Sequence, residues 1–182
     1  WYFLRYCDSK NGKQIFDKKR VERWMPIDTY IGGAEHACMH LIYCRFYTKF
    51  LRDLGLLKFD EPIKKLFNQG MLHGEDGFVM SKSRGNVVLP SEVSNKYGID
   101  TARLFLVSVA SPDKDVEWSE KGIESSLRFV NKVMNYFSGK EFGGEEPGIE
   151  SRFNKAIKEI SEDIGNFRYN LAVIKIRELF EK

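Results

Sequence analysis

A pair of glycines, Gly32-Gly33, constrains the fold of this chain more than any other feature. The pair stands between an apolar segment that ends at Tyr30-Ile31 and a stretch over 34–54 whose apolar residues recur at helical spacing. Gly55 suits the C-terminal cap of that helix. Small residues between a strand end and a helix start let a ligand approach the backbone, and the helix N-terminus favours anionic or polar groups.

The following residues continue to alternate between strands and helices. Residues 1–7 suit a buried strand or a short helix, and we expect strands at 66–72 and 87–89. We also expect a helix from Pro90 to Gly98 and another over 101–110 capped by Asp100. The order strand, helix, strand, helix favours an α/β layer with parallel strands.

The character of the chain changes after residue 118. Ser119 is a good N-cap for a helix that reaches about residue 138, and residues 151–182 predict two amphipathic helices with a break near Gly165. We therefore predict an α/β domain over 1–118 and the start of an all-helical bundle over 119–182.

Composition narrows the class of protein. The 182 residues are 42% apolar and carry a net charge of +3, which fits a soluble globular chain without a broad basic field for nucleic acid. The longest apolar stretch is too short to span a membrane. The chain lacks an initiator Met, and its last helical pattern ends without a stop signal, so we expect a piece of a longer protein.

The segment 80–86 carries the first chemical signal. It reads Met-Ser-Lys-Ser-Arg-Gly-Asn, which places Lys82 between two serines on a glycine-bounded loop. An ammonium, hydroxyl donors and unobstructed backbone N–H groups suit a mobile clamp on phosphates. A bare Ser-Lys-Ser would more often be a solvated surface loop, so this signal depends on its context.

The second signal is the stretch around the glycine pair. Glu35 lies in the first helical turn, where it can accept ribose hydroxyls, and His36 and His40 are spaced to share one helix face. Two such histidines can bind zinc, but a zincin requires Glu directly after the first His, and here Glu35 precedes it. The three cysteines form no Cys-x-x-Cys pair, so we predict neither a zinc site nor a disulfide framework.

These segments together resemble the class I aminoacyl-tRNA synthetases. Residues 79–83 are similar to the Lys-Met-Ser-Lys-Ser motif of that class, with Val79 in place of its first Lys. The stretch 30–46 is similar to the Gly-Gly-x-Glu-His…His-Leu…Arg-Phe segment of leucyl-tRNA synthetases, and the start Trp-Tyr-Phe-Leu-Arg-Tyr to a segment of the same enzymes. The resemblance is continuous over residues 1 to about 137. It implies the second half of a Rossmann-like nucleotide-binding fold.

The resemblance implies a role for each matching residue. Catalysis would involve residues 80–86, the signature loop of this class, in which Lys82 would meet the ATP phosphates. The roles fall into three groups: catalytic Met80, Ser81, Lys82 and Ser83; ATP- or adenylate-binding Gly32, Gly33, Glu35, Met71, Leu72 and Lys82; and a leucine pocket of Tyr2, Tyr30, His36 and His40.

The implied reaction joins leucine to its tRNA through a leucyl-adenylate. It implies ATP with Mg²⁺, L-leucine, leucine tRNA and the remainder of the synthetase chain as partners, no membrane, and a cytoplasmic location. The chain lacks the His-Ile-Gly-His motif of the family, so we expect this piece alone to be inactive. Alternatives are a class I synthetase for valine, isoleucine or methionine, a non-catalytic tRNA-binding module, and a zinc hydrolase using His36, His40 and Cys38.

Overall fold

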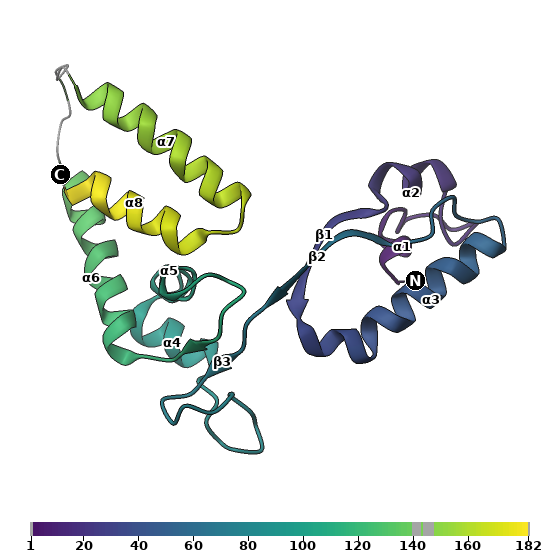
Figure 1. Cartoon of the computed structure of the whole chain (residues 1–182), viewed down its shortest axis with the longest axis horizontal. Coiled ribbons are helices and arrows are strands. Elements are labelled where there is room, and N and C mark those ends of the chain that lie inside the picture. Colours follow the sequence, from purple (N-terminus) through teal and green to yellow (C-terminus); the bar gives the residue numbers. More distant parts are fainter. Residues whose placement is uncertain (1, 140–142, 144–147, 182) are drawn as a thin grey trace. The chain divides into compact units, whose positions relative to one another are not determined.

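The chain divides into two compact units, residues 1–69 and 70–182 (Figure 1). The computed structural model describes residues 2–139, 143 and 148–181, apart from the side chain of Tyr2. Each unit has its own core of buried apolar side chains. The domain boundary predicted at residue 118 stays a prediction.

The first unit is built on two parallel strands. Strands β1 (Ile27–Gly33) and β2 (Ile63–Gln69) pair along their whole length. The connection between them contains a 3₁₀ helix, η1 (Ala34–Cys38), and helix α3 (His40–Asp53). Parallel neighbours require such a crossover because a tight hairpin would make them antiparallel. This confirms the predicted α/β arrangement with parallel strands.

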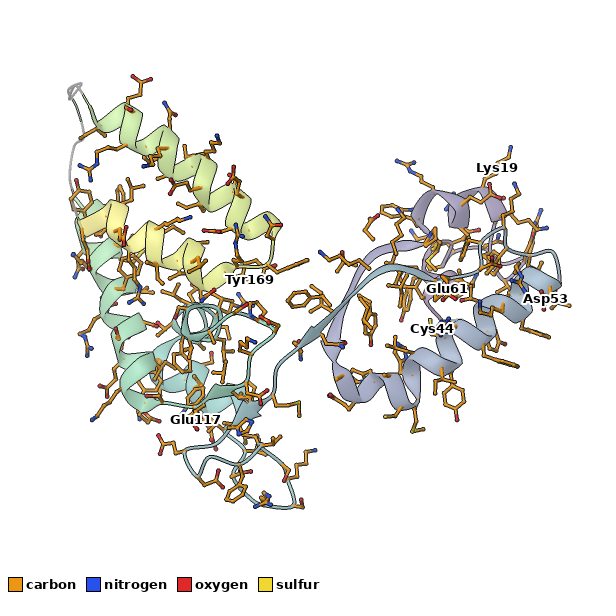
Figure 2. All side chains as sticks on the ribbon, in the orientation of Figure 1. Lys19, Cys44, Asp53, Glu61, Glu117 and Tyr169 are labelled. Atoms are coloured by element: carbon orange, nitrogen blue, oxygen red, sulfur yellow. The ribbon has the colours of Figure 1, made fainter. Side chains whose placement is uncertain are left out.

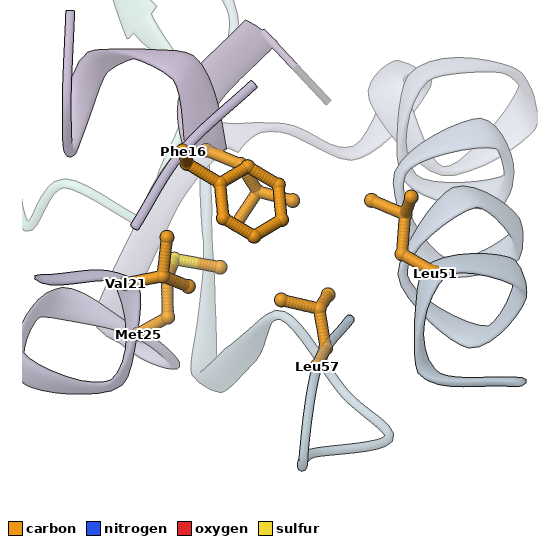
Figure 3. Close-up of a cluster of buried hydrophobic side chains, with 6 residues drawn as sticks. Phe16, Val21, Met25, Leu51 and Leu57 are labelled. Carbon is orange, nitrogen blue, oxygen red and sulfur yellow. The ribbon is translucent and has the colours of Figure 1, made fainter. Parts of the chain in front are cut away.

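Two short helices precede these strands. Helix α1 (Tyr2–Tyr6) takes the helical option predicted for residues 1–7, and α2 (Lys18–Trp24) begins where Asp17 accepts a hydrogen bond from the backbone N–H of Arg20 at 3.1 Å. Side chains from α1, α2, α3 and the connecting loops form the core of this unit (Figure 3). Its buried members are Leu4, Phe16, Val21, Met25, Leu51 and Leu57.

A cluster of ion pairs fixes α3 to the residues that lead into β2. Glu61 accepts from Arg45 through both carboxylate oxygens, at 2.8 and 2.7 Å, and from Lys49 at 3.0 Å. Figure 2 shows Glu61 beside α3. These hydrogen bonds from two cations lower the pKa of Glu61 to about 2. The cluster therefore ties the middle of α3 to the start of β2.

The second unit combines a short parallel ladder with five helices in its described part. Strands β3 (Leu72–His73) and β4 (Val116–Glu117) pair in parallel. The helices are α4 (Pro90–Tyr97), α5 (Ile99–Val109), α6 (Glu120–Phe137), α7 (Ile149–Gly165) and α8 (Tyr169–Glu181). None of the described helices is both long and apolar enough to cross a membrane.

Helix α5 is central to this unit, because α4, α6 and α8 all pack against it. The buried residues around it are Val93, Tyr97, Ala102, Phe105, Trp118 and Ile123. Helices α7 and α8 form an antiparallel hairpin (Figure 1). Asp163 holds its turn, accepting hydrogen bonds from Arg168 at 2.8 Å and Lys175 at 2.7 Å. The predicted helices over 119–138 and 151–182, and the break near Gly165, are confirmed for the residues that the structure describes.

Three predictions of local structure for residues 66–110 are wrong. Residues 87–89 form no strand; Val88 instead packs against the core of the second unit. Helix α5 begins earlier than predicted, so Asp100 lies in its first turn and Gly98, with φ of 81°, is the N-cap. The single strand expected over 66–72 is divided into β2 and β3, because the chain at Gly70 leaves β2 and its N–H donates to the carbonyl of Pro112 at 2.9 Å.

Candidate functional site

The first part of the site is the turn between β1 and α3. The helix predicted over 34–54 is not continuous: residues 34–38 form a 3₁₀ turn, and α3 starts at His40 after Met39 adopts φ −134° and ψ −65°. His36 and His40 therefore do not share a face of one α-helix, as their spacing predicted. The tighter 3₁₀ winding changes the direction of each side chain before the break.

The two histidines nevertheless lie side by side, together with Tyr30. The rings of Tyr30 and His40 stack with centroids 5.6 Å apart, and His36 meets His40 edge-on at 6.1 Å. Tyr30 comes from β1, His36 from η1 and His40 from the first turn of α3. The structure thus brings together three of the four residues predicted for the leucine pocket, and the side chain of the fourth, Tyr2, lies outside the described residues.

The glycine pair sits where there is no room for larger residues. A Cβ on Gly32 would lie 3.1 Å from Cε1 of Tyr30 and 3.2 Å from Cδ2 of His36. A Cβ on Gly33 would lie 2.1 Å from a carboxylate oxygen of Glu35. Both glycines are buried while Glu35 is exposed. The turn therefore holds a carboxylate against bare backbone, which suits the recognition of hydroxyl groups beside a close backbone approach.

A cavity of about 380 Å³ lies next to this turn, within the first unit. Tyr30 and His40 form part of its wall, and apolar groups dominate the remainder. The other lining residues are Phe3, Leu4, Met25, Ile27, Tyr43, Cys44, Tyr47, Thr48, Pro62 and Ile63. Burial raises the pKa of the Cys44 thiol, so this thiol stays uncharged at neutral pH. Such a wall suits an apolar side chain of a ligand.

The second part of the site is the loop 80–86 in the second unit. The N–H of Met80 donates to the carbonyl of Leu72 at 2.9 Å, and the N–H groups of Arg84 and Gly85 donate to the carbonyl of Ser81, each at 3.2 Å. These bonds close a single turn that ends at Gly85 with φ of 70°.

The turn presents its central lysine to solvent. Lys82 and Ser83 are exposed, and no described residue pairs with the Lys82 ammonium. The hydroxyl oxygens of Ser81 and Ser83 lie 3.2 Å apart. The loop thus offers an unpaired cation beside two hydroxyl groups, which is the arrangement expected of a phosphate clamp.

Met71 and Leu72, the residues predicted to meet adenine, lie just before this loop. The N–H of Met71 donates to Asp115 at 2.7 Å, and its carbonyl accepts from Val116 at 2.9 Å. Met71 is exposed and Leu72 is half-buried in β3. A Cβ on the preceding Gly70 would lie 2.0 Å from the carbonyl oxygen of Lys114. The segment is thus held against residues 112–116, with the Met71 side chain left accessible.

Sequence reasoning assigned no role to Asn86 or Asp76, which shape the loop. Asn86 bonds to Ser81 and to Asp76 and so joins two turns. The dipeptide Asp76-Gly77 is a turn signal in the sequence, and Gly85 is a further bend residue beside Asn86. These signals do not show that the two side chains meet.

Metal binding was the main competing interpretation of the histidines. Over the part of the chain that the structure describes, no three His, Cys, Asp or Glu side chains group as they would around a metal ion. Mg²⁺ commonly binds through substrate phosphates and one or two carboxylates, and so does not need such a group.

The fold and these two segments define a class of protein. Residues 10–119 match the model of the family described as tRNA synthetases class I (I, L, M and V). The chain belongs to this family.

Relatives within the family are named as leucine–tRNA ligases. That of Fervidobacterium nodosum is 45% identical over 192 residues, which cover 98% of this chain and 23% of the relative. That of Thermotoga maritima is 46% identical over 193 residues, with the same coverage. The chain thus spans about a quarter of the length of these curated relatives. These similarities confirm the resemblance to leucyl-tRNA synthetases.

Solved structures agree with this placement. The LeuRS of Agrobacterium radiobacter K84, solved as a ternary complex with tRNA and LeuAMS, superposes with a TM-score of 0.87 at 33% identity. The alignment covers 98% of this chain and 25% of that one. The methionyl-tRNA synthetase of Mycobacterium tuberculosis superposes with a TM-score of 0.66 at 19% identity, which supports the fold alone. The predicted fold class is therefore confirmed.

Proposed function

We propose that the protein containing this chain ligates leucine to its tRNA through a leucyl-adenylate. The observation that carries the proposal is the exposed Lys82 ammonium, unpaired among the described residues, on a turn closed by its own backbone. In the first step a leucine carboxylate oxygen attacks the α-phosphorus of ATP, and the bond to the bridging oxygen breaks. Pyrophosphate leaves with the electron pair of that bond.

Lys82 offsets the negative charge that develops on the departing pyrophosphate. A preorganised cation is worth more in the transition state than in the ground state because that charge grows as the bond breaks. Ser81 and Ser83 donate hydroxyl hydrogen bonds to phosphate oxygens, and Met80 anchors the turn through its backbone bond to Leu72. Mg²⁺ bound to the ATP phosphates neutralises part of their charge.

The turn after β1 recognises the other parts of the adenylate. Gly32 and Gly33 leave the backbone open to the nucleotide, and Glu35 accepts hydrogen bonds from the ribose hydroxyls. Met71 and Leu72 contact the adenine ring.

The leucine side chain lies against Tyr30, His36 and His40, and the family resemblance implies Tyr2 as a fourth pocket residue. In the second step a hydroxyl of the terminal tRNA ribose attacks the acyl carbon, loses its proton, and displaces AMP. The cytoplasmic location and the partners leucine tRNA and the remainder of the chain belong to this proposal.

The test is ATP–pyrophosphate exchange by the full-length protein with leucine, valine, isoleucine and methionine as substrates. Lys82→Ala should lower leucine-dependent exchange by about two to three orders of magnitude, since one preorganised donor contributes about 3–4 kcal/mol. Lys19→Ala, which removes another exposed lysine on α2, should leave exchange unchanged. Full exchange activity in Lys82→Ala would refute the role of Lys82. Exchange stimulated by another of these amino acids in place of leucine would refute leucine as the substrate. Absence of ATP binding would indicate a non-catalytic module.

A further inference from the structure

The side chain of Asn86 holds the two ends of the signature loop together. Its Oδ1 accepts the backbone N–H of Ser81 at 2.9 Å, directly before Lys82. Its Nδ2 donates to both carboxylate oxygens of Asp76 at 3.1 Å, and lies 3.3 Å and 3.4 Å from the carbonyls of Phe78 and Val79. One amide thus joins the two ends of the Lys82 turn and links them to the preceding turn.

Asp76 supports this amide from the other side. Its Oδ1 also accepts the backbone N–H of Phe78 at 3.1 Å, so the carboxylate holds both the 74–78 turn and Asn86. The pKa of Asp76 lies below its ordinary value, and the hydrogen bond from Asn86 is the largest cause. A Cβ on Gly74 would lie 2.8 Å from Asp76 Oδ1 and 3.3 Å from Asn86 Nδ2, so a side chain at position 74 would collide with the pair.

The chemistry of the pair is specific. A carboxamide has one acceptor oxygen and a nitrogen with two hydrogens, and here the oxygen meets an N–H while the nitrogen meets a carboxylate. A carboxylate at position 86 would keep the bond to Ser81 but place a second negative charge against Asp76. The loop has one isolated β-bridge and a few backbone turn bonds, so these side-chain bonds add to the backbone bonds that hold its shape.

The loop is fixed on both sides of Lys82, while Lys82 itself stays unpaired within the described structure. The Arg84 guanidinium lies 4.4 Å from the centroid of the Phe78 ring, in a cation–π contact that restrains the far side of the turn. Lys82 is therefore the cation of this turn that stays available to a ligand.

We propose that Asn86 and Asp76 are positioning residues that hold the turn so that the Lys82 ammonium meets the leaving pyrophosphate. This inference rests on the proposed function, and it assigns to the pair a role in the activation step alone. A misplacement of a catalytic group by about 1 Å can lower a rate by about 100-fold. Asn86→Asp should therefore lower kcat for leucine-dependent exchange by about 10- to 100-fold.

A second variant swaps the two residues of the pair. In the double variant Asp76→Asn/Asn86→Asp, the new carboxylate at position 86 accepts from Ser81 and from the new amide at position 76. That amide's oxygen can still accept from Phe78. The carbonyls of Phe78 and Val79, which face the Asn86 nitrogen, would then face a carboxylate oxygen. The double variant should therefore recover part, but not all, of the kcat lost in Asn86→Asp, which a general weakening of the fold would not allow.

The experiment uses the full-length protein and separates the two steps of the reaction. In Asn86→Asp the KM for leucine and the transfer of leucine from preformed adenylate to tRNA should be unchanged, because pyrophosphate has already left before transfer. Asn11→Asp is a matched control, since the Asn11 amide donates to Asp8 at 2.7 Å in a turn of the first unit. It should lower thermal stability without lowering kcat for exchange.

Three results would overturn the inference. They are a wild-type kcat in Asn86→Asp, no recovery in the double variant, and an equal loss in exchange and in transfer. Lys82→Ala measured in the same series distinguishes this failure from failure of the proposed function. If Lys82→Ala loses exchange while Asn86→Asp keeps it, the positioning role is wrong and the function of Lys82 stands.

Discussion

The substitution Gly122→Ala tests the closest helix contact in the second unit. Gly122 lies in the first turn of α6, and a Cβ there would lie 2.7 Å from Cε2 of Phe105. Phe105 is 1% exposed and meets Trp118 edge-on, with ring centroids 5.3 Å apart. The ring therefore has no open space into which it can rotate, and the added methyl group must displace α6 from α5.

The size of the effect follows from two opposing contributions. Alanine favours a helix over glycine by at most about 1 kcal/mol. Carbon atoms pack best at about 3.5–4.0 Å, so the new contact is too short by about 1 Å. Overpacking of this kind costs about 1–3 kcal/mol. We therefore expect Gly122→Ala to destabilise the packing of α5 and α6 by about 1–2 kcal/mol.

Hydrogen exchange read by mass spectrometry measures this change locally. A loss of about 1–2 kcal/mol should speed exchange of α5 and α6 amides by about 5- to 30-fold. Gly165→Ala is the matched control, because Gly165 ends α7 and a Cβ there would meet no atom within 4 Å. In this control variant, amide hydrogen exchange should stay the same or become slower. Adding Phe105→Leu to Gly122→Ala should relieve the clash. Unchanged or slower exchange in Gly122→Ala would refute the packing argument.

Two further predictions concern carboxylates of the first unit. The folded pKa of Glu61, about 2, is below its ordinary value, so its bonds to Arg45 and Lys49 stabilise the unit at neutral pH and are lost as pH falls from about 4.5 through 2. A carboxyl NMR titration should show this midpoint, and Arg45→Ala should raise it; a midpoint near 4.5 in the parent chain would contradict the prediction. In the full-length protein, Gly33→Ala should displace the exposed carboxylate of Glu35 and raise the KM for ATP about tenfold, equal to one weakened charge-assisted hydrogen bond. An unchanged KM for ATP would argue against contact between Glu35 and the nucleotide.

The helices of the second unit were predictable because their signals are local. Pro90 opens α4, and the Ser119 side chain accepts the N–H of Gly122 at 3.2 Å at the start of α6. The errors arose where tertiary contacts decide. The apolar run 87–89 suits a strand by composition, but Val88 is used for packing against the core. Asp100 has the chemistry of an N-cap, yet Gly98 takes that position with a positive φ that glycine adopts at little cost.

The turn after β1 marks a different limit. Apolar spacing continues from residue 34 through 54, so periodicity alone cannot separate a 3₁₀ turn from the first turn of an α-helix. The glycine pair and the residues around it were found as a motif. The stacking of Tyr30 on His40 was not, because it depends on the break at Met39.

The signature loop shows why a motif identifies a ligand group more readily than the structure that supports it. Lys82 was found because residues 79–83 resemble the signature motif of class I synthetases, whereas its small neighbours alone also fit a solvated surface loop. Asn86 and Asp76 act through each other, ten residues apart, and both also fit the ordinary composition of turns. A glycine-rich loop with little ladder pairing has few backbone bonds to hold its shape, and Asn and Asp side chains are well suited to add bonds to its backbone. In such loops an Asn directly after the final glycine, with an Asp in the preceding turn, is therefore a candidate for the side chain that joins the two ends of the loop by hydrogen bonds.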